Sequence, residues 1–296
     1  MFDGFETRRI AVEGADIHYK RGGPPDGVPV VLIHGYPQSH LCWRDVAPAL
    51  AEQFNVFVPD LRGYGASTGP EPDPEHLGYS KRAMANDIVG LMAEAGIDRF
   101  AVAGHDRGGR VAYRMALDHP DAVRRLVVLD MIPTLDVVER TSKDLALAVY
   151  HWFFLAQPAP LPETLIAAEP DYYIRWTINS WLGEGFELDA DILAAYCQDF
   201  SHMSVIQAAC EDYRAGMSSD LDDDRADRAA GRRIQCPMHV LWGAQSDDSR
   251  DLGHISTWQN WASGKVTGQA LQSGHFLPEE RPREVVHEIA KFLTDL

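Results

Sequence analysis

Short runs of apolar residues recur along the chain and alternate with stretches of helical pattern. The runs cover residues 28–33, 56–58, 100–103, 126–129 and 238–242. Short apolar runs that alternate with helices are typical of strands buried on both faces of a sheet. The pattern therefore predicts an α/β fold with a mostly parallel sheet flanked by helices.

One helix is predicted between the second and third runs, over residues 83–97. Met84, Ile88, Leu91 and Met92 are spaced so that they form one apolar stripe on a helix. We expect this helix to pack against the sheet and to contribute no functional residue.

The alternation stops after Pro133 and resumes near residue 234. The intervening stretch is richer in aromatic residues, prolines and acidic residues, and its last part, residues 218–233, is densely charged. We interpret residues 135–233 as an inserted helical cap that ends in a solvated charged segment. Residues 1–134 and 234–296 would then form the core, an arrangement that suits a chain of 296 residues.

The charge balance narrows the range of partners. The chain has 27 Lys and Arg residues against 44 Asp and Glu residues, which gives a formal charge of -17. A field of this sign repels nucleic acids and anionic membrane surfaces, so we expect neither as a partner. An anionic small molecule would have to be attracted by local arginines.

Cysteine use and the N-terminal sequence predict a cytoplasmic protein. The four cysteines are scattered, without a C-x-x-C pair or the spacing of a metal site: Cys42, Cys197, Cys210 and Cys236. We expect free thiols in a reducing compartment. The first residues lack the apolar core of a signal peptide, and no apolar stretch approaches the length of a membrane span.

Reactive residues follow three of the apolar runs and, near the end of the chain, Leu271. They lie in the stretches HGYP at 34–37 and GHDRG at 104–108, at Asp130, and in SGHF at 273–276. Residues just beyond the carboxyl ends of parallel strands collect at one edge of the sheet. The chain order of Asp106, Asp130 and His275 matches the nucleophile, acid and histidine of hydrolases that carry a nucleophile elbow.

Asp106 stands where a serine is usual in such an elbow. Its carboxylate is ionised at neutral pH, and attack on an ester or amide would give an anhydride that readily reverts. Attack on a saturated carbon that bears a leaving group gives a stable ester, so we expect substitution at such a carbon. The backbone N–H groups of Tyr36 and Arg107 would form the oxyanion hole. A helix N-cap is the alternative interpretation of Asp106.

Hydrolysis of the ester needs a base and a group that orients it. We expect His275 to deprotonate the attacking water and Asp130 to orient the imidazole. Asp247 and Asp248 follow a later strand and are the alternative candidates for the acid.

Two arginines beside the nucleophile indicate the charge of the substrate. Arg107 adjoins Asp106, and Arg110 lies three residues further on, so both can face one cleft. Two guanidinium groups near one carboxylate imply a second carboxylate on the substrate. A simple ion pair with Asp106 is the alternative for both, and we expect Arg114 to pair with Asp118.

Several stretches together resemble the fluoroacetate dehalogenases of the α/β-hydrolase fold, over nearly the whole chain. They are GHDRGGR at 104–110, HPDAVRRLVVLDMIPT at 119–134, HWFFLAQPAP at 151–160, CEDYRAG at 210–216 and SGHFLPEE at 273–280. The resemblance implies that Asp106 is the nucleophile, with Asp130 and His275 as its partners. It also implies that Arg107 and Arg110 bind the substrate carboxylate.

The resemblance further implies a halide pocket formed by His151, Trp152 and Tyr213. Imidazole N–H, indole N–H and phenol O–H can all donate to a departing fluoride, so this chemistry requires neither a cofactor nor a metal. A homodimer is the assembly that the family suggests. Two features depart from the family pattern: Tyr36 replaces a common phenylalanine, and the acidic stretch SDDS at 246–249 is not expected.

These observations predict a hydrolase that converts haloacetates such as fluoroacetate and chloroacetate to glycolate and halide through an aspartyl ester. The alternatives are a haloalkane dehalogenase, a non-catalytic ligand-binding protein of the same fold, and an epoxide hydrolase. In the last case the donors to the epoxide oxygen would come from Tyr150, Tyr172, Tyr173 or Tyr213. The paired arginines argue against the haloalkane and epoxide reactions, and the intact set of Asp106, Asp130 and His275 argues against the ligand-binding protein.

Overall fold

A computed structural model describes residues 1–246 and 252–294 of the chain. Its central sheet has eight strands in the order β1-β2-β4-β3-β5-β6-β7-β8. The strands are β1 (Glu6–Val12), β2 (Ala15–Gly22), β3 (Val28–Ile33), β4 (Phe54–Pro59), β5 (Phe100–His105), β6 (Val123–Leu129), β7 (Met238–Gly243) and β8 (Val266–Leu271). All neighbours from β4 to β8 pair in parallel, and the fold class predicted from the sequence is confirmed.

Each of the five apolar runs lies within a strand, from β3 to β7. The sequence reasoning missed the antiparallel hairpin of β1 and β2, which pairs Ile10 with Ile17 and turns at Gly14, where φ is +77°. Most of β1 is exposed, and its apolar residues are confined to its last three positions, residues 10–12.

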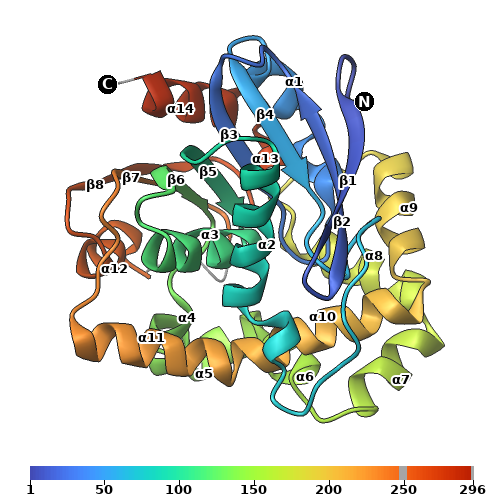
Figure 1. Ribbon diagram of the computed structural model, residues 1–296. Coiled ribbons are helices and arrows are strands. Elements are labelled where there is room, and N and C mark those ends of the chain that lie inside the picture. Colours follow the sequence, from blue (N-terminus) through green and yellow to red (C-terminus); the bar gives the residue numbers. More distant parts are fainter. Residues whose placement is uncertain (247–251, 295–296) are drawn as a thin grey trace.

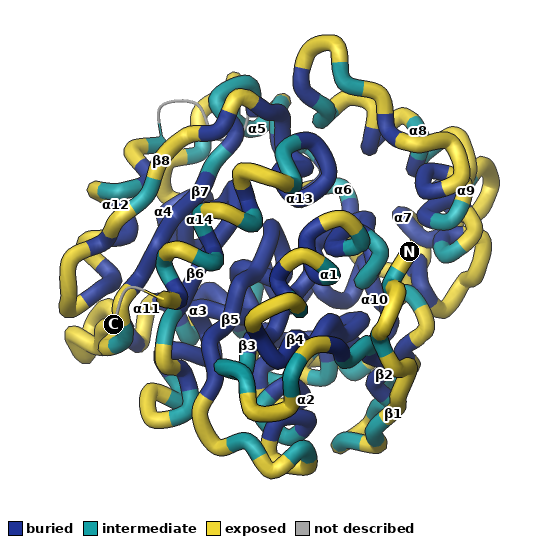
Figure 2. The backbone as a smooth tube through the Cα atoms, turned by 90° about the horizontal axis from the view of Figure 1, so that it is seen from above, coloured by how far each residue is buried: buried dark blue, intermediate teal, exposed yellow. Residues whose placement is uncertain are grey.

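Alternating strand residues face two separate apolar clusters, one on each side of the sheet. On one side the strands pack against α2 (Lys81–Glu94), α3 (Arg107–Asp118) and α12 (His254–Trp261). On the other side they pack against α1 (Ala47–Leu50), α13 (Leu277–Glu280) and α14 (Pro282–Thr294). Figure 2 shows the buried strands between these helices. The helix predicted over 83–97 corresponds to α2, which begins at Lys81 after the N-cap Ser80.

Eight helices separate β6 from β7, and Figure 1 shows them gathered on one side of the sheet. They are α4 (Thr134–Glu139), α5 (Lys143–Ala148), α6 (Tyr150–Leu155), α7 (Leu161–Ala168), α8 (Pro170–Trp181), α9 (Ala190–Asp199), α10 (Met203–Gly216) and α11 (Ser219–Ala230). We call α4–α11 the inserted helices. In residues 1–246 and 252–294 no helix is both long and apolar enough to cross a membrane.

The prediction of a solvated charged segment at 218–233 is wrong for one face of α11, where Asp220, Asp224 and Asp227 are buried; most other residues of the segment are exposed, as predicted. Asp220 accepts a hydrogen bond from the backbone N–H of Lys81 at 2.8 Å, and Asp227 pairs with Arg114 at 2.5 Å. Arg114 also pairs with Asp118 at 2.9 Å, as predicted. The contacts of Asp220 and Asp227 attach α11 to α2 and α3.

Candidate active site

Asp106 lies in the sharp turn between β5 and α3. Its φ of +48° and ψ of -117° form a strained conformation that few residues other than glycine adopt. The turn is tight enough that a Cβ at Gly108 would lie 2.3 Å from the carbonyl oxygen of His34. The glycine of GHDRGG at this position therefore allows the backbone to pass, and the side chain of Asp106 is held out from the turn.

The carboxylate of Asp106 does not act as a helix N-cap in the described part of the chain. Its Oδ1 accepts a hydrogen bond from the backbone N–H of Tyr36 at 2.8 Å. Because Oδ1 is engaged, Oδ2 is the oxygen left to attack a substrate. The matching oxyanion role of the Arg107 N–H stays a prediction.

His275 and Asp130 meet Asp106 at the carboxyl edge of the sheet. Nδ1 of His275 donates to Oδ2 of Asp130 at 2.7 Å, and Nε2 of His275 lies 4.0 Å from Oδ2 of Asp106. Asp130 also accepts hydrogen bonds from Gly243 N–H and Ser246 Oγ–H, both at 2.8 Å. The alternative acids at 247 and 248 lie outside the described residues.

Both carboxylates are stabilised in their ionised form. Burial alone would raise the pKa of Asp106, but His275, His105 and the two nearby arginines lower the pKa below its usual value. For Asp130, hydrogen bonds from His275 and from Gly243 similarly outweigh burial and lower the pKa. Asp106 is therefore available as an anionic nucleophile at neutral pH.

Arg107 is already paired. Its Nε and Nη2 donate to the carboxylate of Asp212 at 3.0 and 2.6 Å, and its guanidinium lies 4.1 Å from the ring centroid of Tyr213. Asp212 also accepts hydrogen bonds from Lys81 and from the hydroxyl of Tyr64. Of the three guanidinium nitrogens of Arg107, only Nη1 is buried without a hydrogen-bond partner among the described residues.

Arg110 is buried without a carboxylate partner among the described residues. Its Nη1 donates to Ile132 O and Thr134 Oγ1, both at 3.0 Å, and its guanidinium lies 4.3 Å from the ring centroid of Trp152. The Nε has no hydrogen-bond partner in the described structure, and the side chain is 3% exposed. Burial, and then the charge of Arg107, lower the pKa of Arg110. A buried cation in this state favours the binding of an anion.

The three residues assigned to a halide pocket lie together. The ring of Tyr213, on α10, has its centroid 5.6 Å from that of His151 and 6.3 Å from that of Trp152, both on α6. Within the described chain, His151 Nδ1 and the Tyr213 hydroxyl are buried without hydrogen-bond partners. Burial lowers the pKa of His151 to about 3, so its imidazole is neutral at physiological pH.

Sequence reasoning missed the contribution of Trp181 at the end of α8. Its ring centroid lies 4.5 Å from that of His151 and 5.4 Å from that of His275. The ring therefore contacts both the predicted halide pocket and the predicted base. The ring of Tyr36 also stacks on His151, at 6.1 Å between centroids. The aromatic richness of residues 172–181 was the only signal for Trp181, and it does not identify one ring.

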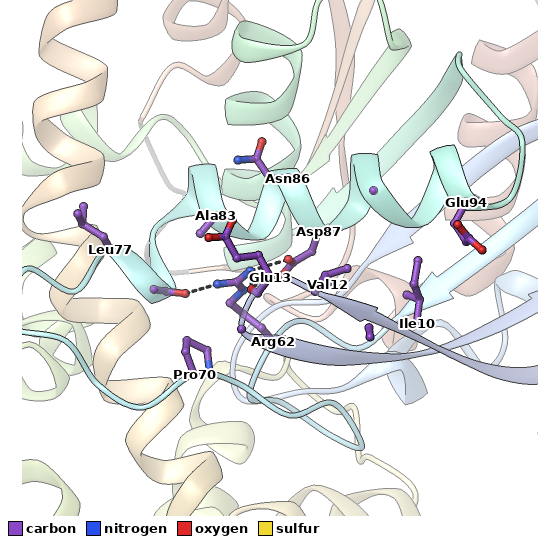
Figure 3. A pocket seen from close by; sticks show the side chains of 14 residues that line it. Ile10, Val12, Glu13, Arg62, Pro70, Leu77, Ala83, Asn86, Asp87 and Glu94 are labelled. Atoms are coloured by element: carbon purple, nitrogen blue, oxygen red, sulfur yellow. Dashed lines mark hydrogen bonds and ion pairs between the residues drawn. The ribbon is translucent and has the colours of Figure 1, made fainter.

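A small cavity of about 20 Å³ lies beside Asp106, Arg110 and Trp152. Its lining residues come from the core and from the inserted helices: Asp106, Arg110, Asp130, Met131, Ile132, Val137, Val149, Trp152 and Leu252. A larger pocket, of about 740 Å³, lies between the β1–β2 hairpin and α2 (Figure 3). That pocket contains none of the predicted site residues, and its Arg62 is bound to Asp87 through two hydrogen bonds. The small cavity is therefore the better candidate for a reaction site.

Among the described residues, one group of side chains has the composition of a metal site: His18, His40 and Asp60. Nδ1 of each histidine lies 2.8 Å from an oxygen of Asp60, which also accepts hydrogen bonds from the backbone N–H of His40 and of Ala66. These distances are those of hydrogen bonds, and both carboxylate oxygens are satisfied. We interpret the group as a hydrogen-bonded support at the end of β4.

Comparison with known proteins agrees with this architecture. The family model of the α/β hydrolase fold matches residues 28–184. A fluoroacetate dehalogenase from Burkholderia sp. is 40% identical over 100% of this chain and 96% of its own length. A soluble epoxide hydrolase from Corynebacterium sp. (strain C12) is 36% identical over 96% of both. The crystal structure of ALR0039 from Nostoc sp PCC 7120, described as an α/β hydrolase, has a TM-score of 0.96 and 45% identity, with 100% of both chains covered.

The chain belongs to the α/β hydrolase fold family and is a hydrolytic enzyme. The resemblance to fluoroacetate dehalogenases seen in the sequence motifs is confirmed by the full-length similarity. Since an epoxide hydrolase is also similar over nearly the full length, the substrate has to be argued from the site itself.

Proposed function

We propose that the protein is a haloacetate dehalogenase that releases halide from fluoroacetate or chloroacetate through a covalent ester on Asp106. Arg110 is the observation that carries this proposal. A buried guanidinium beside the nucleophile, without a carboxylate partner in the described structure, supports an anionic substrate. Haloacetates combine a carboxylate with a leaving group on a saturated carbon, which matches both Arg110 and an aspartate nucleophile.

The two arginines would play unequal parts. Asp212 balances the charge of Arg107, which therefore offers mainly its single free Nη1 group. Arg110 has no carboxylate ion pair among the described residues and would supply the positive charge that binds the substrate. The substrate carboxylate would lie between the two guanidinium groups, with its α-carbon toward Asp106.

The first stage is a displacement at the α-carbon. Oδ2 of Asp106 forms a bond to this carbon while the carbon–halogen bond breaks and the halide leaves with the bonding electrons. No proton moves in this stage. The halide would accept hydrogen bonds from His151, Trp152 and Tyr213, two of which have buried polar atoms without partners in the described structure.

The second stage is hydrolysis of the ester. His275 Nε2 takes a proton from water, and the water oxygen adds to the carboxyl carbon of Asp106. Negative charge then develops on Oδ1, which already faces the Tyr36 N–H at 2.8 Å. The tetrahedral intermediate then collapses, and the bond between the carboxyl carbon of Asp106 and the ester oxygen breaks. The departing glycolate oxygen receives the proton from His275. Asp130 stabilises the imidazolium in between.

An epoxide substrate fits the site less well. Tyr172 is 68% exposed, whereas Tyr213 and Tyr173, whose hydroxyl accepts from that of Tyr36 at 3.2 Å, could each donate to an epoxide oxygen, so it is Arg110 that disfavours an epoxide. A neutral epoxide or haloalkane would leave the buried guanidinium of Arg110 without a direct anionic partner. These contacts favour the acid over either neutral substrate.

The test compares fluoroacetate, chloroacetate, a neutral chloroalkane of similar size and a small terminal epoxide with the purified full chain. Halide release and diol formation are measured under the same conditions. We expect halide release from the two acids and at most weak turnover of the neutral compounds. Efficient opening of the epoxide together with no halide release from either acid would refute the proposal.

The ester can be tested separately in isotopically labelled water, with enzyme in excess over haloacetate. In a single turnover the label should enter Asp106 and leave the first glycolate nearly unlabelled, because the glycolate oxygen comes from Asp106. Labelled glycolate in the first turnover would instead make Asp106 a general base.

A further inference from the structure

The loop that carries His275 is held by a buried carboxylate that the proposed reaction does not use. Glu280, at the end of α13, accepts a hydrogen bond from Gly274 N–H at 2.7 Å and another from Phe276 N–H at 3.0 Å. The side chain of Glu280 is buried. The residues on both sides of His275 are therefore fixed by one carboxylate.

The same carboxylate reaches the inserted helices. Glu280 accepts a third hydrogen bond from Gly183 N–H at 3.0 Å, just beyond the end of α8. In return, the backbone N–H of His275 donates to the carbonyl of Trp181 at 2.9 Å. A Cβ at Gly183 would lie 2.6 Å from Glu280 Oε2, so the approach requires glycine. The His275 loop and the end of α8 thus form one hydrogen-bonded unit.

We propose that Glu280 is a positioning residue for His275 in the hydrolysis of the ester. The inference rests on the proposed two-stage reaction. A general base must lie within hydrogen-bond reach of the water that it deprotonates, and a displacement of about 1 Å can cost on the order of 100-fold in rate. Glu280 sets the backbone position of His275, while Asp130 sets the orientation of its ring.

The two stages depend on this positioning to different degrees. Displacement of the halide needs Asp106 and no proton transfer, whereas ester hydrolysis needs His275 as the base. Loss of the Glu280 carboxylate should therefore slow the second stage and leave the first nearly intact. A loss of overall fold would slow both stages together.

The variant Glu280→Gln keeps the size of the side chain and removes one acceptor. Whichever way the amide is turned, its NH₂ group faces a backbone N–H that the carboxylate now accepts. We expect the steady-state rate to fall by about 10- to 100-fold. Rapid-quench kinetics should show a burst of about one halide per active site, and mass spectrometry should find the ester on the peptide that contains Asp106.

Glu279→Gln is the matched control. Glu279 is the neighbouring buried carboxylate of α13, but its side chain binds Arg44, Gln38 and Tyr196 instead of the His275 loop. We expect no accumulation of ester in this variant. Equal slowing of both stages in Glu280→Gln, or an unchanged steady-state rate, would overturn the role of Glu280.

Gly183→Ala perturbs the same unit from the side of the inserted helices and serves if Glu280→Gln does not fold. The added methyl group would press on Glu280 and on Gly274 N, both 2.6 Å away, so ester should again accumulate. Gly264→Ala is its control, because a Cβ there meets no atom within 4 Å in the described structure. If Gly183→Ala folds and slows both stages equally, the inference fails. Absence of halide release by the wild type would refute the proposed function itself.

Discussion

Replacement of Arg110 should abolish most activity on haloacetates while leaving the fold largely intact. Arg110 is 3% exposed, forms no ion pair within the described residues, and lines the small cavity with Asp106. The Asp106 carboxylate attracts the charge of Arg110 without a direct ion pair among the described residues, and an anionic substrate would pair with it directly. Arg110→Met removes that charge, and Arg110→Lys keeps it without the planar fork of donors.

The expected loss of activity on replacement of Arg110 can be worked out from the burial of its guanidinium. Loss of one partner from a buried, hydrogen-bonded charge pair costs about 3–5 kcal/mol. At about 1.4 kcal/mol per tenfold change, this corresponds to a loss of about 100- to 5000-fold in kcat/KM for Arg110→Met. Arg110→Lys retains a point charge, so about 10- to 100-fold is expected.

The assay compares chloroacetate with chloroacetamide, which is nearly the same size and carries no charge. The loss in kcat/KM should be large for the acid and small for the amide, because only the acid pairs with Arg110. Arg107→Met is the matched variant. It removes the partner of buried Asp212 as well, so its free energy of unfolding should fall by about 2 kcal/mol more than that of Arg110→Met.

Three outcomes would refute this reasoning. Arg110→Met could keep wild-type activity on chloroacetate, which would exclude Arg110 as a ligand of the acid. The loss could be equal for chloroacetate and chloroacetamide, which would make the effect one of cavity shape. Finally, Arg107→Met could be the more stable of the two variants, which would contradict the ion-pair assignments.

Three further perturbations test other parts of the site and fold. Trp152→Phe removes an N–H donor, so fluoride release should fall several-fold more than chloride release in parallel halide assays. Equal losses for the two halides would refute the assignment of Trp152 as a halide donor. Asp130→Asn should slow ester hydrolysis on the order of 10³- to 10⁴-fold in single-turnover kinetics, whereas Asp247→Asn and Asp248→Asn should leave its rate nearly unchanged. The reverse ranking would assign the role of the triad acid to Asp247 or Asp248. Burial raises the pKa of Asp224 to about 7, so the folded state holds a proton that the unfolded chain has released above about pH 4. Wild-type stability should therefore decline as pH rises through 7, and Asp224→Asn should show a smaller fall in Tm between pH 5 and 8; parallel curves would contradict this.

Much of the fold was predictable because its central strands are buried on both faces and therefore form continuous apolar runs. The hairpin of β1 and β2 was not, since most of β1 is exposed and carries charged residues at 8 and 9. The charges of α11 were interpreted as solvated because composition does not reveal partners. Lys81 and Arg114, which pair with that helix, are more than 100 residues away in the sequence.

The candidate site likewise contains residues that the sequence could predict and residues that it could not. Asp106, Asp130 and His275 could be proposed because Asp106 and Asp130 directly follow strands, His275 comes four residues after one, and parallel strands bring their ends together. Asp212 and Trp181 reach the site through the packing of the inserted helices, for which no periodicity in the sequence gives a distance. The ion pair between Asp212 and Arg107, which makes the two arginines unequal, could therefore be found only in the structure.

The groups assigned to the leaving halide and the groups assigned to the ester lie on separate stretches of the chain. His151, Trp152 and Tyr213 belong to α6 and α10, whereas the nucleophile, acid and base follow strands of the core. Exchange of residues 134–230 between relatives should therefore change the groups proposed to face the halide and leave the nucleophile unchanged. The backbone contacts at 181 and 183 constrain such grafts, because a segment without glycine at 183 would press on the carboxylate that holds the loop of the base.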